Sequence, residues 1–425
     1  MDTSLRKNLF VIPLPNGKNI VYAPLHGAAF FANEKAASLC KAYISGFSIE
    51  ENAENQSLVS HIKLLEGKNI HLPSEIPVSE TSNNLVVILS QMCNLACSYC
   101  FAQEARSKDI LSQDKLKTAI DYVFDKESKK IHLSFIGGGE PTLTWDLLSW
   151  AITYARGKDL NKNRVSIGVT TNGTLLNDSM IDFLKENDIH IGLSFEILPN
   201  IQNKQRCFTD KKKNSFDIIN TVVNKLITRG VYLSFRSTIT QYNVKLMCEM
   251  VNFVIENYPK VKRLHFEQVT STDLNKTFYD DFIYYFIEAR KLGEINGIEV
   301  CSSVTKSFNT IKSKFCKGEL CLTPTGDIVA CHRISSSDDP AFDLFTYAKV
   351  EDGMLSLDLD KKERIEKFNG IKRDGCSSCF AKWHCAGSCS MEKTIYTNKM
   401  RDLKCYFFKE LIKKLLIERL GSVSP

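Results

Sequence analysis

Residues 90–101 read SQMCNLACSYCF, and three cysteines in this stretch decide how the rest of the chain is interpreted: Cys93, Cys97 and Cys100. They form a CxxxCxxC pattern directly after an apolar run of strand length at residues 85–89. Structural zinc sites close with four protein ligands. Three thiolates without a neighbouring fourth suit a cluster of four irons in which one iron keeps an open position. The pattern therefore predicts a reactive [4Fe–4S] cluster, and a zinc site that borrows a distant ligand is the alternative.

A second group of eight cysteines lies between residues 316 and 405. Its members are Cys316, Cys321, Cys331, Cys376, Cys379, Cys385, Cys389 and Cys405. Eight thiolates can close two further clusters completely, as electron carriers or structural centres require. A zinc ribbon would account only for the part between residues 376 and 389. Four of the fifteen cysteines remain, and we expect them to be small buried side chains: Cys40, Cys207, Cys248 and Cys301.

Length, charge and hydropathy exclude several classes of protein. With 425 residues the chain is long enough for two or three domains. A net charge of +6 without a concentrated basic stripe does not predict a nucleic-acid partner. No apolar run reaches the roughly 18 residues of a membrane span, and no secretory signal is visible at the start. We expect a cytoplasmic protein without a membrane partner, in which clustered cysteines bind metal rather than form disulfides.

The middle of the chain alternates between strand-like and helix-like segments. Strands are expected at residues 85–89, 131–136, 165–169, 189–195, 231–238 and 261–269. Helices are expected at residues 115–124, 145–154, 179–186, 216–228, 246–257 and 278–292. Continuous apolar strands separated by amphipathic helices are typical of a parallel sheet buried on both faces. Six such units predict an α/β fold, a partial (β/α)6 TIM-like barrel over residues 85–305, with its chemistry where the strands end.

Two different regions flank the predicted barrel. Residues 1–80 contain extended pieces at 9–13 and 20–23 and helices at 34–44 and 58–65, which predict a small winged-helix-like α+β module. Residues 71–84 are expected to be a linker. Residues 310–425 are rich in cysteines and turns until a helix near 403–420. Metal clusters would supply the cross-links that such a loop-rich region needs.

The CxxxCxxC pattern, with Tyr99 between its last two cysteines, resembles the signature of the radical S-adenosylmethionine (radical SAM) superfamily. In that family the open iron chelates the methionine part of SAM, and an electron from the cluster releases a 5′-deoxyadenosyl radical. The resemblance implies SAM and a [4Fe–4S] cluster as cofactors. The protein would supply binding and orientation while the cofactor carries the difficult chemistry.

Three further motifs resemble SAM-binding elements of this family. The segment 137–141, GGGEP, resembles the GGE motif that meets the methionine amino group, and TTNG at 170–173 resembles a second element that faces the cofactor. These resemblances imply as SAM contacts Gly138, Gly139, Glu140, Pro141, Thr171 and Asn172. A plain glycine-rich turn is the alternative for the first motif.

The third motif follows the fourth predicted strand. Ser194 and Arg206 stand at the interval at which relatives place a ribose contact and a carboxylate partner, and an arginine fork suits a carboxylate. Relatives have Ser-x-Asp-Gly, whereas this chain has Ser194-Phe195-Glu196, so Ser194 matches the pattern while the candidate Glu196 departs from it by a longer side chain and the Gly is absent. Arg236, after the fifth strand, is a further candidate for SAM binding and equally for a structural ion pair.

The spacing of the eight later cysteines resembles the SPASM domain of radical SAM enzymes that modify peptides and proteins. The resemblance implies two auxiliary [4Fe–4S] clusters, and therefore three clusters in all. The cluster nearer the barrel would be held by Cys316, Cys321, Cys331 and Cys389. The outer cluster would be held by Cys376, Cys379, Cys385 and Cys405. Closed clusters of this kind transfer electrons, at potentials set by hydrogen bonds and exposure.

Two reactions remain open. In sulfatase-maturating relatives, which oxidise a cysteine or serine to formylglycine, an Asp follows the third ligand of the first auxiliary cluster and takes the substrate proton. Here that residue is His332, a candidate base or alternatively a hydrogen-bond partner of cluster or backbone. The substitution favours the second reaction, radical modification of a ribosomally made precursor peptide by a thioether or carbon–carbon cross-link.

The N-terminal module supports the peptide reaction, because its order of strands and helices resembles the leader-binding domains of many peptide maturases. A leader peptide would add as a strand to its sheet, and a structural extension is the alternative. The predicted partners are a precursor peptide with its leader and an electron donor of the flavodoxin or ferredoxin type. An iron–sulfur electron carrier or sensor is the non-enzymatic alternative. It is disfavoured by the GGE motif, Ser194 and Arg206, since a carrier needs no nucleotide pocket.

Overall fold

The computed structural model describes residues 4–15, 17–72, 81–103, 106–126, 130–159, 164–210 and 213–421. The chain forms two compact units that do not follow the order of the sequence. Unit 1 consists of Met1–Glu75, Ser303–Phe315 and Asn369–Pro425, and unit 2 of Ile76–Ser302 and Cys316–Phe368. The cysteine-rich region 310–425 therefore contributes to both units. Most of the predicted linker, residues 73–80, lies outside the described residues.

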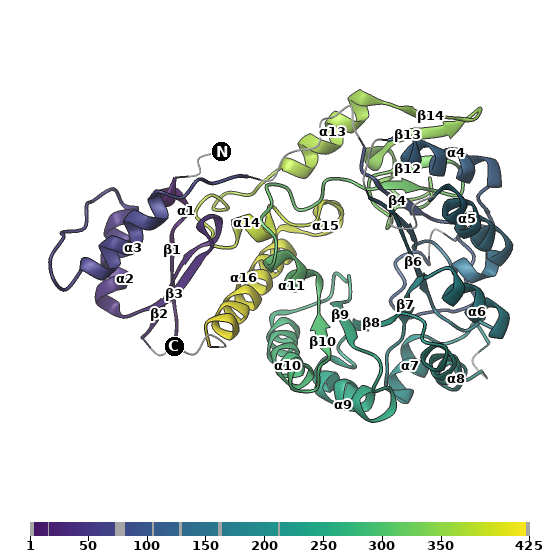
Figure 1. Cartoon of the computed structure of the whole chain (residues 1–425), viewed down its shortest axis with the longest axis horizontal. Helices are drawn as coiled ribbons and strands as arrows, with labels where there is room; N and C mark the ends of the chain where they lie inside the picture. The colour runs from purple at the N-terminus through teal and green to yellow at the C-terminus, as the bar shows by residue number, and fades with distance from the viewer. Residues whose placement is uncertain are drawn as a thin grey trace. The chain divides into compact units, whose positions relative to one another are not determined.

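Unit 2 contains one eleven-stranded sheet of order β10-β9-β8-β7-β6-β5-β4-β11-β12-β13-β14 (Figure 1). Six neighbouring strands are parallel and correspond to the six predicted ones. They are β4 (Asn84–Val87), β5 (Ile131–Phe135), β6 (Val165–Thr171), β7 (His190–Ser194), β8 (Leu233–Ile239) and β9 (Arg263–Gln268). The prediction of a large parallel α/β sheet is confirmed. A seventh parallel strand, β10 (Glu299–Cys301), extends it beside β9.

The predicted helices follow their strands and lie along the outside of the curved sheet (Figure 1). They are α4 (Gln113–Phe124), α5 (Trp145–Lys158), α6 (Asp178–Glu186), α8 (Ser215–Thr228), α9 (Met247–Asn257) and α10 (Lys276–Ile295). Several begin at a side chain that accepts a hydrogen bond from the first helical turn, as Ser112, Asn177 and Asn214 do. Short helices that the sequence analysis did not predict are η2 (Pro141–Thr144), α7 (Pro199–Gln205) and η3 (Val244–Leu246).

The sheet continues past β4 into the cysteine-rich region. β11 (Leu320–Leu322) pairs parallel to β4, and β12 (Asp327–Val329), β13 (Thr346–Glu351) and β14 (Met354–Leu357) follow as antiparallel neighbours. The sequence analysis expected only short pieces and turns here. Strands β11 and β12 have three residues each and are too short to show a clear apolar period, and they form by extending an existing edge. The helices of this region are α12 (Phe342–Phe345) and α13 (Leu359–Gly370).

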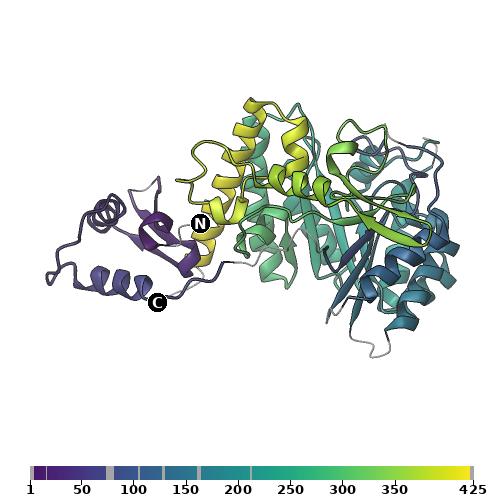
Figure 2. The same cartoon turned by 90° about the horizontal axis from the view of Figure 1, so that it is seen from above.

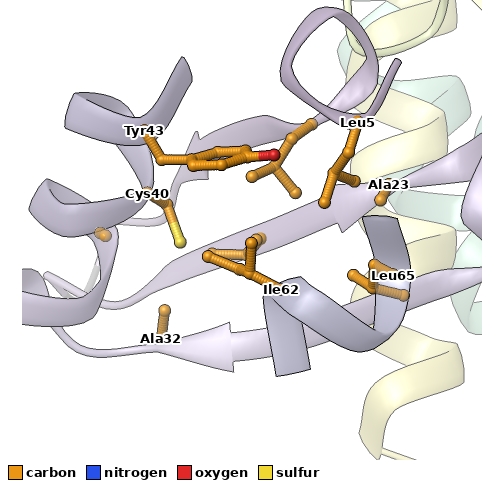
Figure 3. Close-up of a cluster of buried hydrophobic side chains, with 10 residues drawn as sticks. Leu5, Ala23, Ala32, Cys40, Tyr43, Ile62 and Leu65 are labelled. Carbon is orange, nitrogen blue, oxygen red and sulfur yellow. The ribbon is translucent and has the colours of Figure 1, made fainter. Parts of the chain in front are cut away.

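Unit 1 begins with a three-stranded antiparallel sheet of order β1-β2-β3. Its elements are α1 (Leu5–Asn8), β1 (Phe10–Pro13), β2 (Asn19–Ala23), η1 (Pro24–His26), β3 (Ala28–Ala32), α2 (Glu34–Ile44) and α3 (Gln56–Glu66). Figure 2 shows this sheet with α2 and α3 beside it. Cys40 and Tyr43 of α2 and Ile62 and Leu65 of α3 pack against the sheet in one buried core (Figure 3). The predicted helices are present, whereas β3 was not predicted.

The remainder of unit 1 is helical. It contains α11 (Ser303–Phe308), α14 (Lys382–Cys385), α15 (Ser390–Ile395) and α16 (Asn398–Gly421), the last of which contains the predicted C-terminal helix. Helix α16 contacts both α11 and strand β3. Within the described ranges, no helix is both long and apolar enough to cross a membrane.

Candidate active site

A cavity of about 280 Å³ opens at the carboxyl ends of the parallel strands of unit 2. Loops after β4, β5, β6 and β7 contribute most of its wall, together with the segment that contains His332. The predicted residues that line it are Cys93, Cys97, Tyr99, Cys100, Gly138, Gly139, Glu140, Thr171, Asn172, Ser194, Arg206, Arg236 and His332. The fold thus brings together nearly all candidates from six separate segments. Pro141 and Glu196 are buried and lie behind this wall.

The glycines after β5 allow a close approach to the start of the cysteine loop. The backbone N–H of Gly139 donates to the Ser90 carbonyl at 2.8 Å, and that of Glu140 donates to the Met92 carbonyl at 2.8 Å. A Cβ atom on Gly139 would lie 1.8 Å from the Met92 oxygen, and one on Gly138 would lie 2.8 Å from the Ser90 oxygen. The motif therefore needs glycine because two backbones touch, whether or not a ligand is bound.

The other side of the cysteine loop is held by the segment that follows α7. Ala96 donates to the Cys207 carbonyl at 2.8 Å, and Ser98 donates to the Gln205 carbonyl at 3.0 Å. Leu95 packs with Phe208 in a small apolar cluster that includes Cys97. The loop is thereby fixed from two directions, and the orientation of its three thiols is set by backbone contacts.

Glu140 braces the end of β6. Its carboxylate accepts hydrogen bonds from the Thr171 hydroxyl at 2.5 Å, the Asn172 backbone at 2.7 Å and the Thr142 hydroxyl at 2.6 Å. The Asn172 side chain in turn donates to Asn94 of the cysteine loop at 2.9 Å. Burial raises the pKa of the Glu140 carboxyl, although these donors oppose the rise. Glu140 therefore fixes neighbouring segments of the cavity wall.

Glu196 is fully buried and holds two residues of the wall. It pairs with the Arg206 Nε at 2.8 Å, accepts a hydrogen bond from the Tyr99 hydroxyl, and accepts another from the Thr238 backbone at 3.0 Å. The Arg206 guanidinium also lies over the Tyr99 ring, 5.3 Å from its centre. Glu196 therefore acts through Arg206 and Tyr99, whose outer faces border the cavity.

Two arginines lie beside the sulfur atoms of the loop. The Arg206 Nη1 is 4.0 Å from the Cys97 Sγ, and the Arg106 Nη2 is 3.7 Å from the Cys100 Sγ. Burial raises the pKa of the Cys97 thiol to about 12, against the opposing effect of Arg206. Binding of a metal cluster would release this proton, and the two guanidinium groups suit the resulting negative charge. Arg106 was not predicted, because no motif marks it in the sequence.

A thiol–imidazole–carboxylate chain lies next to the cavity and was also not predicted. The Cys301 Sγ of β10 is 3.6 Å from the His265 Nδ1, and the His265 Nε2 is 3.1 Å from Glu267, which lines the cavity. Burial alone would lower the pKa of His265, but its hydrogen bonds with Cys301 and Glu267 raise it. Burial alone would raise the pKa of the Cys301 thiol, but the hydrogen bond with the same imidazole helps to lower it.

The cysteines outside the two groups only partly follow the expectation of small buried side chains. Cys40 and Cys301 are buried, whereas Cys207 and Cys248 are half-buried. Cys301 is moreover part of a polar chain rather than an inert apolar residue. Single cysteines in a sequence do not reveal such partners, because His265 and Cys301 meet only through the pairing of β9 with β10.

His332 is held by a residue that the sequence analysis missed. Its Nδ1 lies 2.9 Å from the Glu319 carboxylate, and its backbone N–H donates to the same group at 2.6 Å. Burial would raise the pKa of Glu319, but the adjacent His332 outweighs burial and lowers it. The imidazole thus has one nitrogen fixed by Glu319 while the residue lines the cavity.

The later cysteines fall into both units. Four of them border a cavity of about 270 Å³ in unit 1: Cys376, Cys379, Cys385 and Cys405. Cys316, Cys321 and Cys331 belong to unit 2, whereas Cys389 belongs to unit 1. Among the residues that the structure describes, no three His, Cys, Asp or Glu side chains are close enough to hold a single metal ion. A cavity ringed by four thiols suits a larger metal cluster.

Comparison with known proteins gives a consistent family. Residues 87–240 match the model of the radical SAM superfamily. The chain is 24% identical over 383 residues to the radical SAM cyclopropyl synthase TigE of Paramaledivibacter caminithermalis, which covers 81% of this chain and 76% of that protein. It is also 24% identical over 333 residues to the cysteine-type anaerobic sulfatase-maturating enzyme of Clostridium novyi, covering 69% of this chain and 87% of that enzyme.

Solved structures share the fold. The structure of anSMEcpe with bound AdoMet (SAM) and the Cp18Cys peptide has a TM-score of 0.67 at 18% identity, over 80% of this chain and 99% of that chain. Streptococcus suis SuiB bound to the precursor peptide SuiA has a TM-score of 0.53 at 14% identity, over 91% and 95% of the two chains. At these identities the likeness establishes the fold.

The contact between Gly139 and Met92 predicts the effect of a single methyl group. Gly139→Ala places a Cβ inside the Met92 carbonyl, and the forced shift should cost about 1–3 kcal/mol of stability and displace the cysteine loop. We expect loss of iron bound by this loop and weaker SAM binding, measured by iron analysis and calorimetry. Gly157→Ala in α5, where nothing lies within 4 Å, is the control and should be neutral or stabilising. Equal behaviour of the two variants would contradict the role of the contact.

The buried ion pair predicts a second effect. Glu196→Gln leaves the Arg206 guanidinium, whose side chain is only 11% exposed, without its counter-charge. We expect a stability loss of about 3 kcal/mol and roughly tenfold weaker SAM binding, measured by thermal unfolding and calorimetry. Glu288→Gln removes an exposed ion pair with Lys291 and should change stability by less than about 1 kcal/mol. Unchanged SAM affinity in the Glu196 variant would contradict its positioning role.

Proposed function

Because this chain is a radical SAM enzyme, we propose that it modifies a ribosomally made precursor peptide by a radical reaction that forms a thioether or carbon–carbon cross-link. The observation that carries the proposal is one cavity that is lined both by the three-cysteine loop and by the motifs proposed to bind SAM. An electron carrier or sensor has no need of a nucleotide-sized cavity beside its cluster.

The residues of the cavity fit the two cofactors that the family implies. Cys93, Cys97 and Cys100 would hold the cluster, and Arg106 and Arg206 would balance its thiolates. A bound SAM molecule would supply the 5′-deoxyadenosyl radical that removes a hydrogen atom from the substrate. The segments at 138–141 and 171–172 would hold the methionine part, and Ser194 would face the ribose.

Arg206 and Arg236 would have different roles toward a bound ligand. One edge of Arg206 is occupied by Glu196, so its remaining donors would meet the carboxylate of SAM. Arg236 lines the cavity, and its side chain lies 3.1 Å from where a Cβ of Gly192 would be. Burial lowers the pKa of the Arg236 guanidinium despite the nearby Glu267. A half-buried cation at the wall suits a carboxylate of SAM or of the peptide.

A peptide substrate is favoured over a small molecule by two observations. Solved structures that share the fold carry bound peptides, a precursor peptide in one case. In addition, the N-terminal module has an antiparallel sheet with two edge strands, β1 and β3. We propose that a leader peptide pairs with an edge of this winged-helix-like module, as in other strand-addition complexes.

The auxiliary clusters would complete the electron balance. Formation of a cross-link removes one hydrogen atom as 5′-deoxyadenosine and leaves one electron and one proton to be removed. We propose that Cys376, Cys379, Cys385 and Cys405 hold the outer cluster and that Cys316, Cys321, Cys331 and Cys389 hold the other. An external donor of the flavodoxin or ferredoxin type would reduce the SAM-binding cluster.

His332 is proposed as the group that takes the released proton. It lines the cavity, and Glu319 fixes its ring as a carboxylate fixes many catalytic imidazoles. Glu267 is a second acceptor at the same wall. Formylglycine formation on a protein is the second candidate function, favoured by the sulfatase-maturating relative. The replacement of its expected Asp by His332 argues against it.

The SAM reaction gives the first test of this function. Anaerobically loaded protein with dithionite should convert SAM to 5′-deoxyadenosine, quantified by chromatography, and should contain about twelve irons per chain for three clusters. Cys97→Ser should abolish the product, whereas Cys248→Ser, remote from the three-cysteine loop in sequence, should not. Fully loaded protein that makes no 5′-deoxyadenosine would contradict the enzyme proposal, and about four irons would contradict the auxiliary clusters.

The peptide reaction gives the second test. A small precursor encoded beside the gene, co-expressed with the enzyme, should lose two hydrogen atoms in its core segment, as measured by mass spectrometry. The same peptide without its leader should remain largely unmodified, because strand addition would be lost. Conversion of a cysteine to formylglycine in a sulfatase-derived peptide, with no change in the precursor, would favour the alternative function instead.

A further inference from the structure

We propose that Asn8 and Tyr22 of the N-terminal module are positioning residues for the outer cluster, because they hold the segment between its ligands Cys379 and Cys385. The proposal rests on the assignment of the outer cluster under the proposed function. It concerns only unit 1, in which both ends of the chain pack together. It gives the module a task besides binding a peptide.

Three consecutive residues before Cys385 bind the N-terminal module. The Trp383 Nε1 donates to the Asn8 Oδ1 at 2.8 Å, and the Lys382 Nζ donates to the Lys7 carbonyl at 2.8 Å. The His384 Nε2 lies 2.5 Å from the Tyr22 hydroxyl. The four side chains involved are all buried: Asn8, Tyr22, Trp383 and His384. Their contacts therefore lie in the interior of unit 1 and not at its surface.

The hydrogen bonds of His384 define which of its two ring nitrogens carries the proton. Its Nδ1 lies 3.0 Å from the Thr310 carbonyl and 3.2 Å from the Ser307 carbonyl, so this nitrogen must carry the proton and donate. The Nε2 is then the acceptor, and the Tyr22 hydroxyl donates to it. Loss of that hydroxyl would leave a buried acceptor unsatisfied.

The ligand segment itself contains strained backbone. Ala386 has φ +46° and Ser388 has φ +68°, between Cys385 and Cys389. Residues other than glycine adopt this left-handed region only when surrounding structure imposes it. Within this unit, the buried contacts of Trp383 and His384 directly precede the strained residues. They are therefore placed to impose the conformation in which Cys385 faces the four-cysteine cavity.

The consequence is a reciprocal coupling between the module and the cluster. Loss of the Tyr22 or Asn8 contact should loosen Cys385 and speed the loss of the outer cluster. Loss of the outer cluster should in turn loosen α1 and β2 of the module. A peptide seated on the β1-β2-β3 sheet would therefore bind to a surface whose order depends on the metal content of unit 1.

Iron release tests the first direction. The full-length loaded protein is exposed anaerobically to EDTA, and iron and cluster-resolved electron paramagnetic resonance signals are followed with time. In Tyr22→Phe and Asn8→Ala we expect one third of the iron to be released at least about fivefold faster than in the wild type. The matched control is Tyr43→Phe, because the Tyr43 hydroxyl bonds Glu66 within the module itself. It should behave as the wild type.

The outcomes separate this proposal from the proposed function. Equal release from the Tyr22 and Tyr43 variants, with the wild type holding three clusters, would overturn the positioning role alone. A wild type that never binds the third cluster would overturn the assignment of the outer cluster and the positioning role with it, while formation of 5′-deoxyadenosine from SAM would still test the enzyme proposal. Formation of 5′-deoxyadenosine from SAM should be retained in the Tyr22 variant, because the SAM site lies in unit 2.

Hydrogen exchange tests the reverse direction and does not depend on activity. Cys385→Ala should raise amide exchange in residues 5–23 by at least about fivefold relative to wild type. Cys93→Ala, which removes a ligand in unit 2, should leave exchange in residues 5–23 unchanged. Equal exchange in the two cysteine variants would contradict the coupling, and increased exchange confined to residues 376–389 would also contradict it.

Discussion

The backbone contact between the segment 138–140 and the start of the cysteine loop is the constraint on which the site depends. Two hydrogen bonds at 2.8 Å join these segments, and there is no space for a side chain at Gly139. A second pair of backbone hydrogen bonds fixes the cysteine loop to residues 205–207, at the carboxyl end of α7. Because both pairs of bonds involve main-chain atoms, the thiols are oriented before any metal arrives. Preorganisation of this kind reduces the cost of binding.

The charged residues of the site form layers around this backbone frame. Glu140 and Glu196 are buried, and their oxygens accept hydrogen bonds from Thr171, Asn172, Tyr99 and Arg206. Both stiffen the wall, and Glu140 also lines the cavity whereas Glu196 lies behind it. The outer layer contains groups with free faces toward the cavity, namely Arg206, Arg236 and His332. The Glu196 carboxylate serves an internal partner, Arg206, rather than the cavity.

Sequence reasoning predicted the parts of the fold that rest on local patterns. The strand β4 belongs to the apolar run at residues 85–89, and the cysteine pattern directly after it marks the loop that borders the cavity. Strands of three residues, such as β10 and β11, were missed because they are too short to show an apolar period. They form because they pair with a neighbouring strand. The same reason hid the chain from Cys301 through His265 to Glu267, which only the parallel register of β9 and β10 brings together. The sequence also carries no sign that its two ends share one unit.

That shared unit has a consequence for how the protein is made. The strands β1 and β2 leave the ribosome before the barrel, whereas α14 and α16 leave it after the barrel. At usual rates of synthesis the delay is on the order of tens of seconds. The barrel residues can collapse during this interval, because their contacts lie within one continuous stretch of the chain apart from its added edge strands. The N-terminal sheet must wait for Trp383 and His384, the partners of the Asn8 Oδ1 and the Tyr22 hydroxyl, so a nascent chain that stalls before residue 380 exposes a surface for chaperones and proteases.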